Sequence, residues 1–465
     1  MPGWLSNFLP ILILLAAIGV VLARLPRVEL GHGEAFRRRR VLNWLPLGLT
    51  YAFLYMGRYN LTVAKNALGD LMTKQDFADI FATGTIVYGI SFVINGPLTD
   101  RWGGRATILI AALGAAACNL AMGWVLASGA TESLTATYSL LYSANMYFQS
   151  FGAVSIVKVN AHWFHVRERG VFGGIFGILI SLGIYFAYDW GKLIVDAFPQ
   201  NVEYVFFIPA AILAVFAVLD WFLVFDLPSR TGHPDIEVGD ASSDDDGRAL
   251  PLLQVAARMF SNPVILTIAL VEFCSGYLRQ TIMQWYPIFA KQTGISSTFV
   301  PSNWGMLLCV AGILGGVFAG TISDRVFQSR RGPVAVLLYG IMIVGSCAMI
   351  FSLASPALGW IVVVMSLAII GVHGMLSGTA SMDFGGKKNA GLAVGIIDGF
   401  VYLGTGLQAI VLGAVLPKDG TPESASPSGW HLWPVVMLPI AVIGTLLAVR
   451  IWHARARPAA QAQSH

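Results

Sequence analysis

Long apolar runs separated by short polar stretches make up most of this sequence. Each run holds about 20 or more residues, the length that a helix needs to cross the hydrocarbon core of a bilayer. Because a backbone in lipid must satisfy its own hydrogen bonds, runs of this length predict helices. Thirteen such runs lie at about residues 4–23, 41–66, 79–98, 106–128, 135–161, 170–195, 203–225, 262–290, 303–322, 333–353, 357–381, 391–416 and 433–452.

Charged residues are scarce outside the polar stretches. The 465 residues include 29 Lys+Arg and 25 Asp+Glu, or 12%, about half the roughly 25% of soluble domains. This composition predicts an all-α polytopic membrane protein and excludes a soluble enzyme, a nucleic-acid binder and a disordered chain. The four cysteines lie inside apolar runs, and we find no catalytic triad, metal-ligand spacing or suitable phosphate-cradling glycine loop. We therefore expect no enzymatic activity, no metal and no cofactor.

A hydrophilic stretch divides the last twelve runs into six and six. It contains acidic, glycine and serine residues and is too short and polar to hold a core. We therefore expect an extra N-terminal transmembrane helix with a basic segment, a six-helix half, a cytoplasmic linker, a second six-helix half and a cytoplasmic tail. Their boundaries are 1–40, 41–225, 226–261, 262–452 and 453–465.

The basic residues are distributed unevenly between alternate connections. Of the 29, 21 lie in one set of connections, five lie in the opposite set or at helix ends, and three lie within spans. The positive-inside rule places the 21 in the cytoplasm, together with the linker and the C-terminus. The first run has no basic residue before it and six in the segment after it. This order favours an outside N-terminus and a retained helix over a cleaved signal peptide.

Two cytoplasmic connections repeat one motif at equivalent places in the two halves. The first is Gly96-x-x-x-Asp100-Arg101, and the second is Gly320-x-x-x-Asp324-Arg325. Repeated halves are a known transporter construction, with the binding site between them near the midplane. Aspartate and arginine at helix ends can pair and latch one conformation; alternatively, the basic residues only fix topology. The predicted gating residues are Asp100, Arg101, Arg105, Asp324, Arg325, Glu168 and Arg169.

Two arginines lie within spans at near-equivalent places of the two halves. Arg58 precedes Asp100 by 42 residues, and Arg279 precedes Asp324 by 45. A charge at the bilayer centre costs at least ~2.5–3.5 kcal/mol and usually faces a cavity. Arginine stays charged, and two unpaired guanidinium groups are suited to binding phosphate or carboxylate between them. The alternative is that each arginine pairs with a nearby acid, such as Glu272 or Asp398.

Other polar residues within the spans are candidate ligands with open roles. Glu272 lies seven residues before Arg279, roughly 10.5 Å along the same helix face. Glu272 and Asp398 could each carry a proton, contact a cationic part of a substrate or be structural partners. Lys158 either draws anions inward or extends its amine to the interface. His373 is interpreted as a hydrogen-bonded packing residue.

Tyrosines accompany the first arginine. Tyr51, Tyr55 and Arg58 are four and three residues apart, so they share one helix face. Tyr88 and Tyr402 lie in other spans. We expect these four tyrosines to line the cavity, where their hydroxyls could bond phosphate oxygens.

Several motifs carry a family resemblance. They are Tyr51-x-x-x-Tyr55-x-x-Arg58-x-Asn60, Tyr88-Gly89, Lys158-x-x-x-His162-Trp163-Phe164, Glu168-Arg169-Gly170, Asp226-x-Pro228, Leu278-Arg279, Lys387-Lys388-x-x-Gly391 and Tyr402-Leu403-Gly404. The chain resembles the major facilitator superfamily over about residues 41–452 and, within it, the organophosphate:phosphate antiporters, which carry glycerol 3-phosphate, hexose phosphates or phosphoglycerates.

The resemblance implies the major facilitator fold, an arginine pair that binds the phosphoryl group, and inorganic phosphate as counter-substrate. It also implies that the two halves rock around this site. Three positions depart from the glycerol-3-phosphate carriers: Tyr59, Phe92 and Ile180 stand where those carriers have two lysines and a histidine. These departures argue against glycerol 3-phosphate itself, and the acidic Glu272 and Asp398 indicate a different selectivity, for a ligand with a hydroxyl-rich or cationic part.

Together these observations predict a monomeric inner-membrane antiporter. It would exchange a phosphorylated small metabolite for inorganic phosphate by alternating access, with the lipid bilayer as its other partner. The alternatives are a proton-coupled organic-anion symporter, with Glu272 or Asp398 titrating, and a membrane receptor for sugar phosphate.

Overall fold

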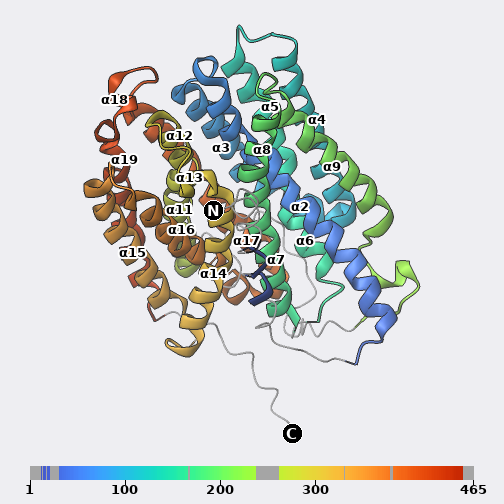
Figure 1. The fold of residues 1–465 in the computed structure, drawn as a ribbon. Coiled ribbons are helices and arrows are strands. Elements are labelled where there is room, and N and C mark those ends of the chain that lie inside the picture. The colour runs from blue at the N-terminus through green and yellow to red at the C-terminus, as the bar shows by residue number, and fades with distance from the viewer. Residues whose placement is uncertain are drawn as a thin grey trace.

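The protein is built from helices arranged as two adjoining bundles (Figure 1). The computed structural model describes residues 12, 14–16, 18–20, 31–165, 168–236, 261–328, 330–376 and 381–453, and no strand occurs among them. The predicted first transmembrane helix lies largely outside the described residues, as do most of the linker and nearly all of the tail. The all-α architecture predicted from the apolar runs is confirmed.

The N-terminal bundle holds the six runs predicted between residues 41 and 225. Its helices are α2 (Glu34–Leu68), α3 (Lys74–Trp102), α4 (Gly104–Ala127), α5 (Leu134–Gln149), α6 (Phe151–Asn160), α7 (Arg169–Tyr185), α8 (Gly191–Ala197) and α9 (Tyr204–Leu223). Short turns lie at η1 (Gly69–Leu71), η3 (Phe186–Trp190) and η4 (Pro228–Thr231).

The C-terminal bundle holds the remaining six runs. Its helices are α11 (Pro263–Met283), α12 (Trp285–Gln292), α13 (Phe299–Ser302), α14 (Trp304–Arg325), α15 (Arg331–Ser352), α16 (Ala357–Met375), α17 (Ser381–Val415), α18 (Pro422–Ala425), α19 (Leu432–Val435) and α20 (Met437–Arg450), with the short turn η6 (Pro427–Trp430). Capping residues fix where some of these helices begin. At α11, Asn262 accepts hydrogen bonds from two backbone N–H groups and Pro263 occupies the first turn.

Several predicted spans are interrupted rather than continuous. One is divided at Ser150 into α5 and α6, another at Gln284 into α11 and α12, and a third contains the π-helical turn η3. Within the described residues, nine helices are long and apolar enough to cross a membrane. The helices that carry Arg58 and Arg279 are not among the nine.

The polarity of the molecule is that of a membrane protein. Large apolar side chains face outward, including Phe351 and Leu140, which are 87% and 72% exposed. Polar side chains are buried instead: Asn60 donates to Asn119, and Asn119 in turn donates to Asn145. In water this arrangement would be unfavourable, whereas in a bilayer it puts apolar surface against lipid.

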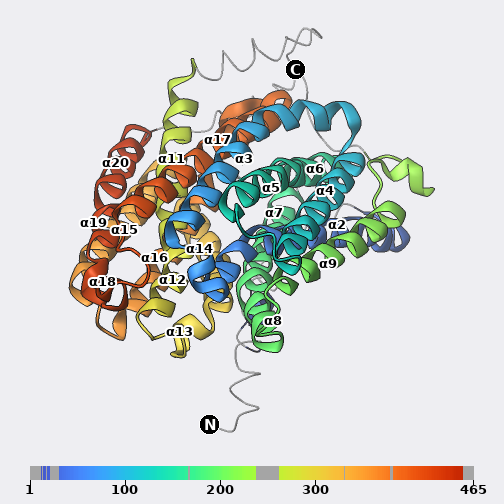
Figure 2. The ribbon, with the colours of Figure 1, turned by 90° about the horizontal axis from the view of Figure 1, so that it is seen from above.

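Among the described helices, the most extensive contacts between the bundles are those of α3 with α17 and of α7 with α14. Viewed from above, α3 and α17 run alongside each other at the boundary between the halves (Figure 2). A Cβ added at Gly89 would lie 2.8 Å from the carbonyl oxygen of Gly399. Small residues in membrane helices permit such close backbone approach.

Close helix packing within the C-terminal half supplies a stability prediction. In Gly276→Ala the new methyl group would collide with the carbonyl of Val401 in α17, and overpacking costs about 1–3 kcal/mol. We expect a lower melting temperature in detergent. Gly316→Ala is the matched control, because a Cβ there meets nothing within 4 Å. Equal melting temperatures for the two variants would contradict the close crossing.

Candidate functional site

Arg58 is completely buried in the middle of α2 and is held by groups from three other helices. Its Nε donates to Oε1 of Gln149 at 3.0 Å. One terminal nitrogen donates to the Tyr88 hydroxyl at 2.7 Å and the other to the Tyr402 hydroxyl at 2.8 Å. Since Tyr402 belongs to α17, this guanidinium joins the two halves at the centre of the molecule.

Arg279 lies in α11 and is 7% exposed. Its Nε has no hydrogen-bond partner within the described part of the chain. Both guanidinium groups interact electrostatically with the same three residues, Tyr55, Tyr59 and Tyr402. The two cations therefore border one shared, tyrosine-lined region.

Among the described residues, no carboxylate lies within ion-pair distance of either arginine, although Glu272 interacts electrostatically with Arg279. Glu272 is fully buried, and its Oε2 lies 2.9 Å from Nδ1 of His373 in α16. Asp398 is partly buried in α17 and interacts electrostatically with Tyr88. Two neighbouring cations without paired acids repel each other, and an anion between them would relieve that repulsion.

The remaining predicted tyrosines are buried beside Arg58. The Tyr55 and Tyr88 rings lie 4.7 and 4.4 Å from its guanidinium carbon, the range of cation–π contact. Tyr51 packs edge-on against Tyr55 with ring centroids 5.4 Å apart. The rings shield the charge from lipid, while their hydroxyl groups add polar partners.

Lys158 lies in the last turn of α6, at the end predicted to be cytoplasmic. Its Nζ lies 2.8 Å from Oδ1 of Asp100, the aspartate of the first repeated motif. The lysine is thus placed at the predicted mouth of the pathway and paired with a predicted gating residue.

The other predicted gating residues also make contacts inside one half. Glu168 pairs with Arg40 at 2.9 Å, and Arg105 donates to the backbone carbonyl of Trp221. Arg101 and Arg325 are exposed. The side chains of Arg169 and Asp324 lie outside the described part of the structure, and the latch remains a prediction.

A cluster of buried charged residues, which the sequence motifs did not indicate, connects the halves at the helix ends that lie away from Asp100 and Lys158. Lys65 and Lys74 are 4% and 3% exposed, and the Nζ of each lies 3.9 Å from a carboxylate oxygen of Asp419. Lys74 also donates to Gln292 at 2.7 Å and lies 4.7 Å from the Trp430 ring centroid. The sequence had marked the two lysines only as basic residues of the outer side.

Further polar contacts join the halves on this same side. The carboxylate of Asp189 accepts from the backbone N–H groups of Gly305 and Met306 at 2.8 and 2.9 Å, capping α14 from the other half. Deeper in, Gln280 donates to the Tyr59 hydroxyl at 2.9 Å, and Thr62 donates to Gln284. Together with the Asp419 cluster, these contacts form a polar seam between the halves on the side predicted to face outward.

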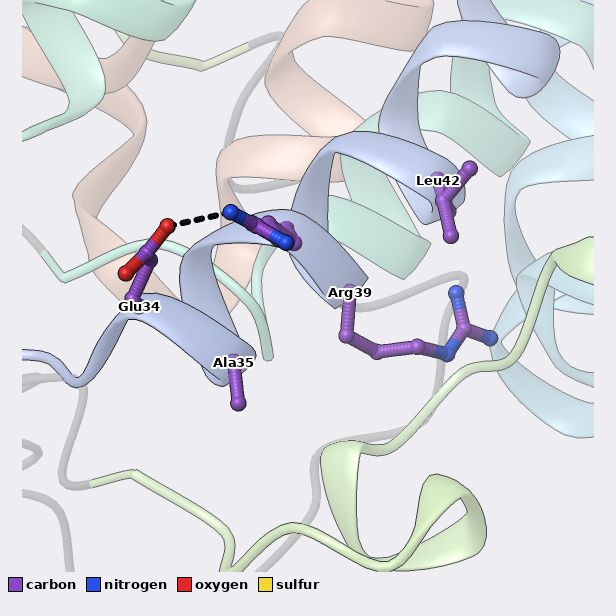
Figure 3. A pocket seen from close by; sticks show the side chains of 5 residues that line it. Glu34, Ala35, Arg39 and Leu42 are labelled. Carbon is purple, nitrogen blue, oxygen red and sulfur yellow. Dashed lines mark hydrogen bonds and ion pairs between the residues drawn. The ribbon is translucent and has the colours of Figure 1, made fainter.

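A separate surface depression lies on the first turns of α2. Glu34, Ala35, Arg38, Arg39 and Leu42 line it, and Arg38 pairs with Glu34 across it (Figure 3). Leu42, the lining residue nearest to Arg58 in the sequence, precedes it by 16 residues along one helix, roughly 24 Å. The depression is therefore remote from the arginine site.

Comparison with known proteins identifies the family. Residues 47–409 match the sequence profile of the Major Facilitator Superfamily. The chain belongs to this superfamily and is a multi-pass membrane transport protein rather than an enzyme. The predicted all-α major facilitator fold class is thereby confirmed, whereas the arrangement of two six-helix halves plus one extra helix remains a prediction.

Its relatives narrow the family. The chain is 29% identical to the glycerol-3-phosphate transporter of Bacillus subtilis, over 80% of this chain and 84% of that protein. It is 25% identical to a probable hexose phosphate transport protein of Chlamydia trachomatis, over 90% and 91% of the two chains. It is also 25% identical to the membrane sensor protein UhpC of Salmonella typhimurium, over 82% and 85%. These relatives are organophosphate:phosphate antiporter family members, as the resemblance predicted.

A solved structure supports the fold independently. A bacterial homolog of the human lysosomal transporter Spinster superimposes with a TM-score of 0.68 at 14% identity, covering 91% of this chain and 98% of that one.

Proposed function

We propose that this protein exchanges a phosphorylated small metabolite for inorganic phosphate across the bacterial inner membrane. The observation that carries the proposal is the pair of buried guanidinium groups, which interact with the same tyrosines and form no ion pair with a described carboxylate. A doubly charged phosphoryl group between them would neutralise both cations and accept their N–H donors. Relatives named as glycerol-3-phosphate and hexose phosphate transporters support this substrate class.

Alternating access follows from the contacts between the halves. The polar seam of Asp419, Asp189 and Tyr59 lies on the side that the charge distribution assigns to the exterior. We interpret the structure as a state closed to the outside, with the N-terminus outside and the C-terminus in the cytoplasm. Opening outward requires the seam to break while the cytoplasmic ends of the helices close.

Anion binding would couple this rocking to exchange. An empty site leaves two buried cations whose repulsion disfavours bringing the halves together around them. A bound anion removes this repulsion, so the loaded carrier crosses between states faster than the empty one. One monomer contains both arginines, and we propose that a monomer is the transporting unit.

Two observations favour alternative functions. The buried Glu272–His373 pair could carry a proton in an organic-anion symporter. A relative named as a membrane sensor supports a receptor that binds sugar phosphate without moving it.

Counterflow in proteoliposomes tests these functions. We expect trapped inorganic phosphate to drive uptake of labelled phosphate and of an organic phosphate with no pH gradient. Uptake that needs a proton gradient and is indifferent to trapped phosphate would establish the symporter instead. Binding without any uptake would establish the receptor.

A further inference from the structure

One face of α11 carries a row of buried polar side chains whose hydrogen bonding is incomplete. Glu272, Ser275 and Arg279 are three and four residues apart, so they lie on one face of the helix. Glu272 and Ser275 are fully buried, and Arg279 is 7% exposed. Among the described residues, Oε1 of Glu272, Oγ of Ser275 and Nε of Arg279 have no hydrogen-bond partner.

The other buried polar side chains of α11, Gln280 and Thr281, have hydrogen-bond partners. Hydroxyl groups in membrane helices usually donate to a carbonyl one turn earlier, as Thr281 does to Tyr277 at 2.7 Å and Ser366 does to Val362 at 2.7 Å. Ser275 makes no such bond. Buried donors and acceptors without partners cost free energy, and three in a row beside a transport site indicate that a ligand supplies the partners.

The two ends of the row differ in hydrogen-bonding character, since one end accepts and the other donates. His373 occupies Oε2 of Glu272 at 2.9 Å, which fixes the carboxylate and leaves Oε1 as an acceptor. Arg279, at the other end, has only donors. The backbone positions of Glu272 and Arg279 are about 10.5 Å apart along the helix. A matching ligand must therefore offer an acceptor at one end and a donor at the other.

We propose that Glu272 and Ser275 form a second subsite, which binds the hydroxyl-bearing carbon skeleton of an organic phosphate whose phosphoryl group lies at Arg279. The substrate class is a phosphorylated sugar or other polyhydroxy compound with hydroxyl groups at the end away from the phosphate. The proposal rests on the phosphate-exchange function proposed above and specifies which phosphate esters are selected.

Two competing ligand types fit the row less well. A phosphoglycerate would bring a second carboxylate against Glu272, where like charges repel in a site of low dielectric constant. A phosphorylated amine could donate to Glu272 and to the Ser275 oxygen, but its ammonium has no lone pair, so the O–H donor of Ser275 would stay unpaired. Hydroxyl groups both donate and accept, so they satisfy both side chains.

Equilibrium binding to the purified full-length protein in detergent tests the subsite. The probes are glucose 6-phosphate, 3-phosphoglycerate, phosphoethanolamine and inorganic phosphate. For the wild type we expect glucose 6-phosphate to bind about tenfold or more tighter than 3-phosphoglycerate. The carboxylate of 3-phosphoglycerate would lie unpaired beside Glu272, and the repulsion between two such buried charges is sufficient for that ratio. Phosphoethanolamine should also bind more weakly than glucose 6-phosphate.

The variants separate the subsite from the arginines. Glu272→Gln removes the negative charge, so we expect the preference for glucose 6-phosphate over 3-phosphoglycerate to fall to about threefold or less. Ser275→Ala should weaken glucose 6-phosphate about three- to tenfold, the effect of one lost hydrogen bond. Inorganic phosphate bound at Arg279 is too short to reach Glu272 or Ser275, so its affinity should stay within about twofold in both variants. Glu132→Gln, exposed on a loop, is the control and should match the wild type.

Equal wild-type affinity for 3-phosphoglycerate and glucose 6-phosphate, or an unchanged ratio in Glu272→Gln, would overturn the subsite. If Glu272→Gln does not yield folded protein, the wild-type ratio and Ser275→Ala decide the matter alone. Because binding does not depend on transport, a protein with the expected preference but no phosphate exchange would refute only the proposed antiport. Exchange without the preference would refute only the subsite.

Discussion

Arg279→Lys is expected to weaken inorganic phosphate binding about 10- to 100-fold while leaving membrane insertion intact, because hydrogen bonds to charged groups contribute about 1.5–3 kcal/mol. Lysine retains the positive charge but has a compact ammonium in place of the planar fork that engages two phosphate oxygens. The Nε of Arg279 has no hydrogen-bond partner among the described residues. The substitution should therefore lower the affinity for phosphate much more than it lowers the stability of the fold. Isothermal titration in detergent measures the affinity, and phosphate exchange in proteoliposomes measures the transport consequence.

The same substitution at Arg58 should behave differently. Arg58 donates to Gln149, Tyr88 and Tyr402, and lysine cannot reproduce that planar geometry. We expect Arg58→Lys to lose phosphate binding and also to lower the melting temperature, whereas Arg279→Lys melts like the wild type. Arg38→Lys, on the exposed start of α2, controls for the substitution itself. Full phosphate affinity in Arg279→Lys would show that the two arginines do not form an anion clamp.

Asp419→Asn is expected to open the outer side of the protein. The substitution removes the carboxylate that both buried lysines, Lys65 and Lys74, approach, and removing one partner of a buried ion pair costs about 3–5 kcal/mol. Because both lysines would regain water when the halves part, the cost falls on the closed state. The ratio of outward-open to outward-closed protein should therefore rise about 100-fold or more.

Distances between spin labels across the outer face can measure this change. Labels at the exposed positions Glu132 and Glu423 report on the N-terminal and C-terminal halves respectively. We expect a new population with a longer distance in Asp419→Asn, together with slower exchange, because the return to the closed state becomes unfavourable. Asp196→Asn, at an exposed aspartate on the same side that pairs only with Lys192 among the described residues, should leave the distribution unchanged. An unaltered distribution in Asp419→Asn would mean that the cluster does not hold the halves together.

The sequence predicted the candidate site through the two charged residues that lie within apolar spans, because burying a charge in a membrane has a high free-energy cost. Arg58 and Arg279 stood out because two cations at matching places in a repeated, apolar framework have few structural explanations. The structure places both arginines beside the same tyrosines. The helix interruptions at Ser150 and Gln284 were not predicted, since neither residue breaks the apolar run in which it lies.

Partners distant in the chain could not be predicted. Glu272 had three possible roles from sequence, and only the packing of α16 against α11 brings His373 to its carboxylate. Lys65 and Lys74 appeared as topology markers, because nothing in their local sequence indicates an aspartate some 350 residues later.

The sequence by itself determined that this chain crosses a membrane as two related halves and that two arginines remain charged within it. These properties follow from local composition, since each apolar run and each buried charge has its energetic cost wherever the chain folds. The tertiary structure alone decided which acids lie near which cations, which polar atoms remain available to a ligand and where the halves are joined. Such pairings form between helices that are far apart in the chain. The sequence allows several partners for each group, and only the packing of the helices determines which partner lies within contact.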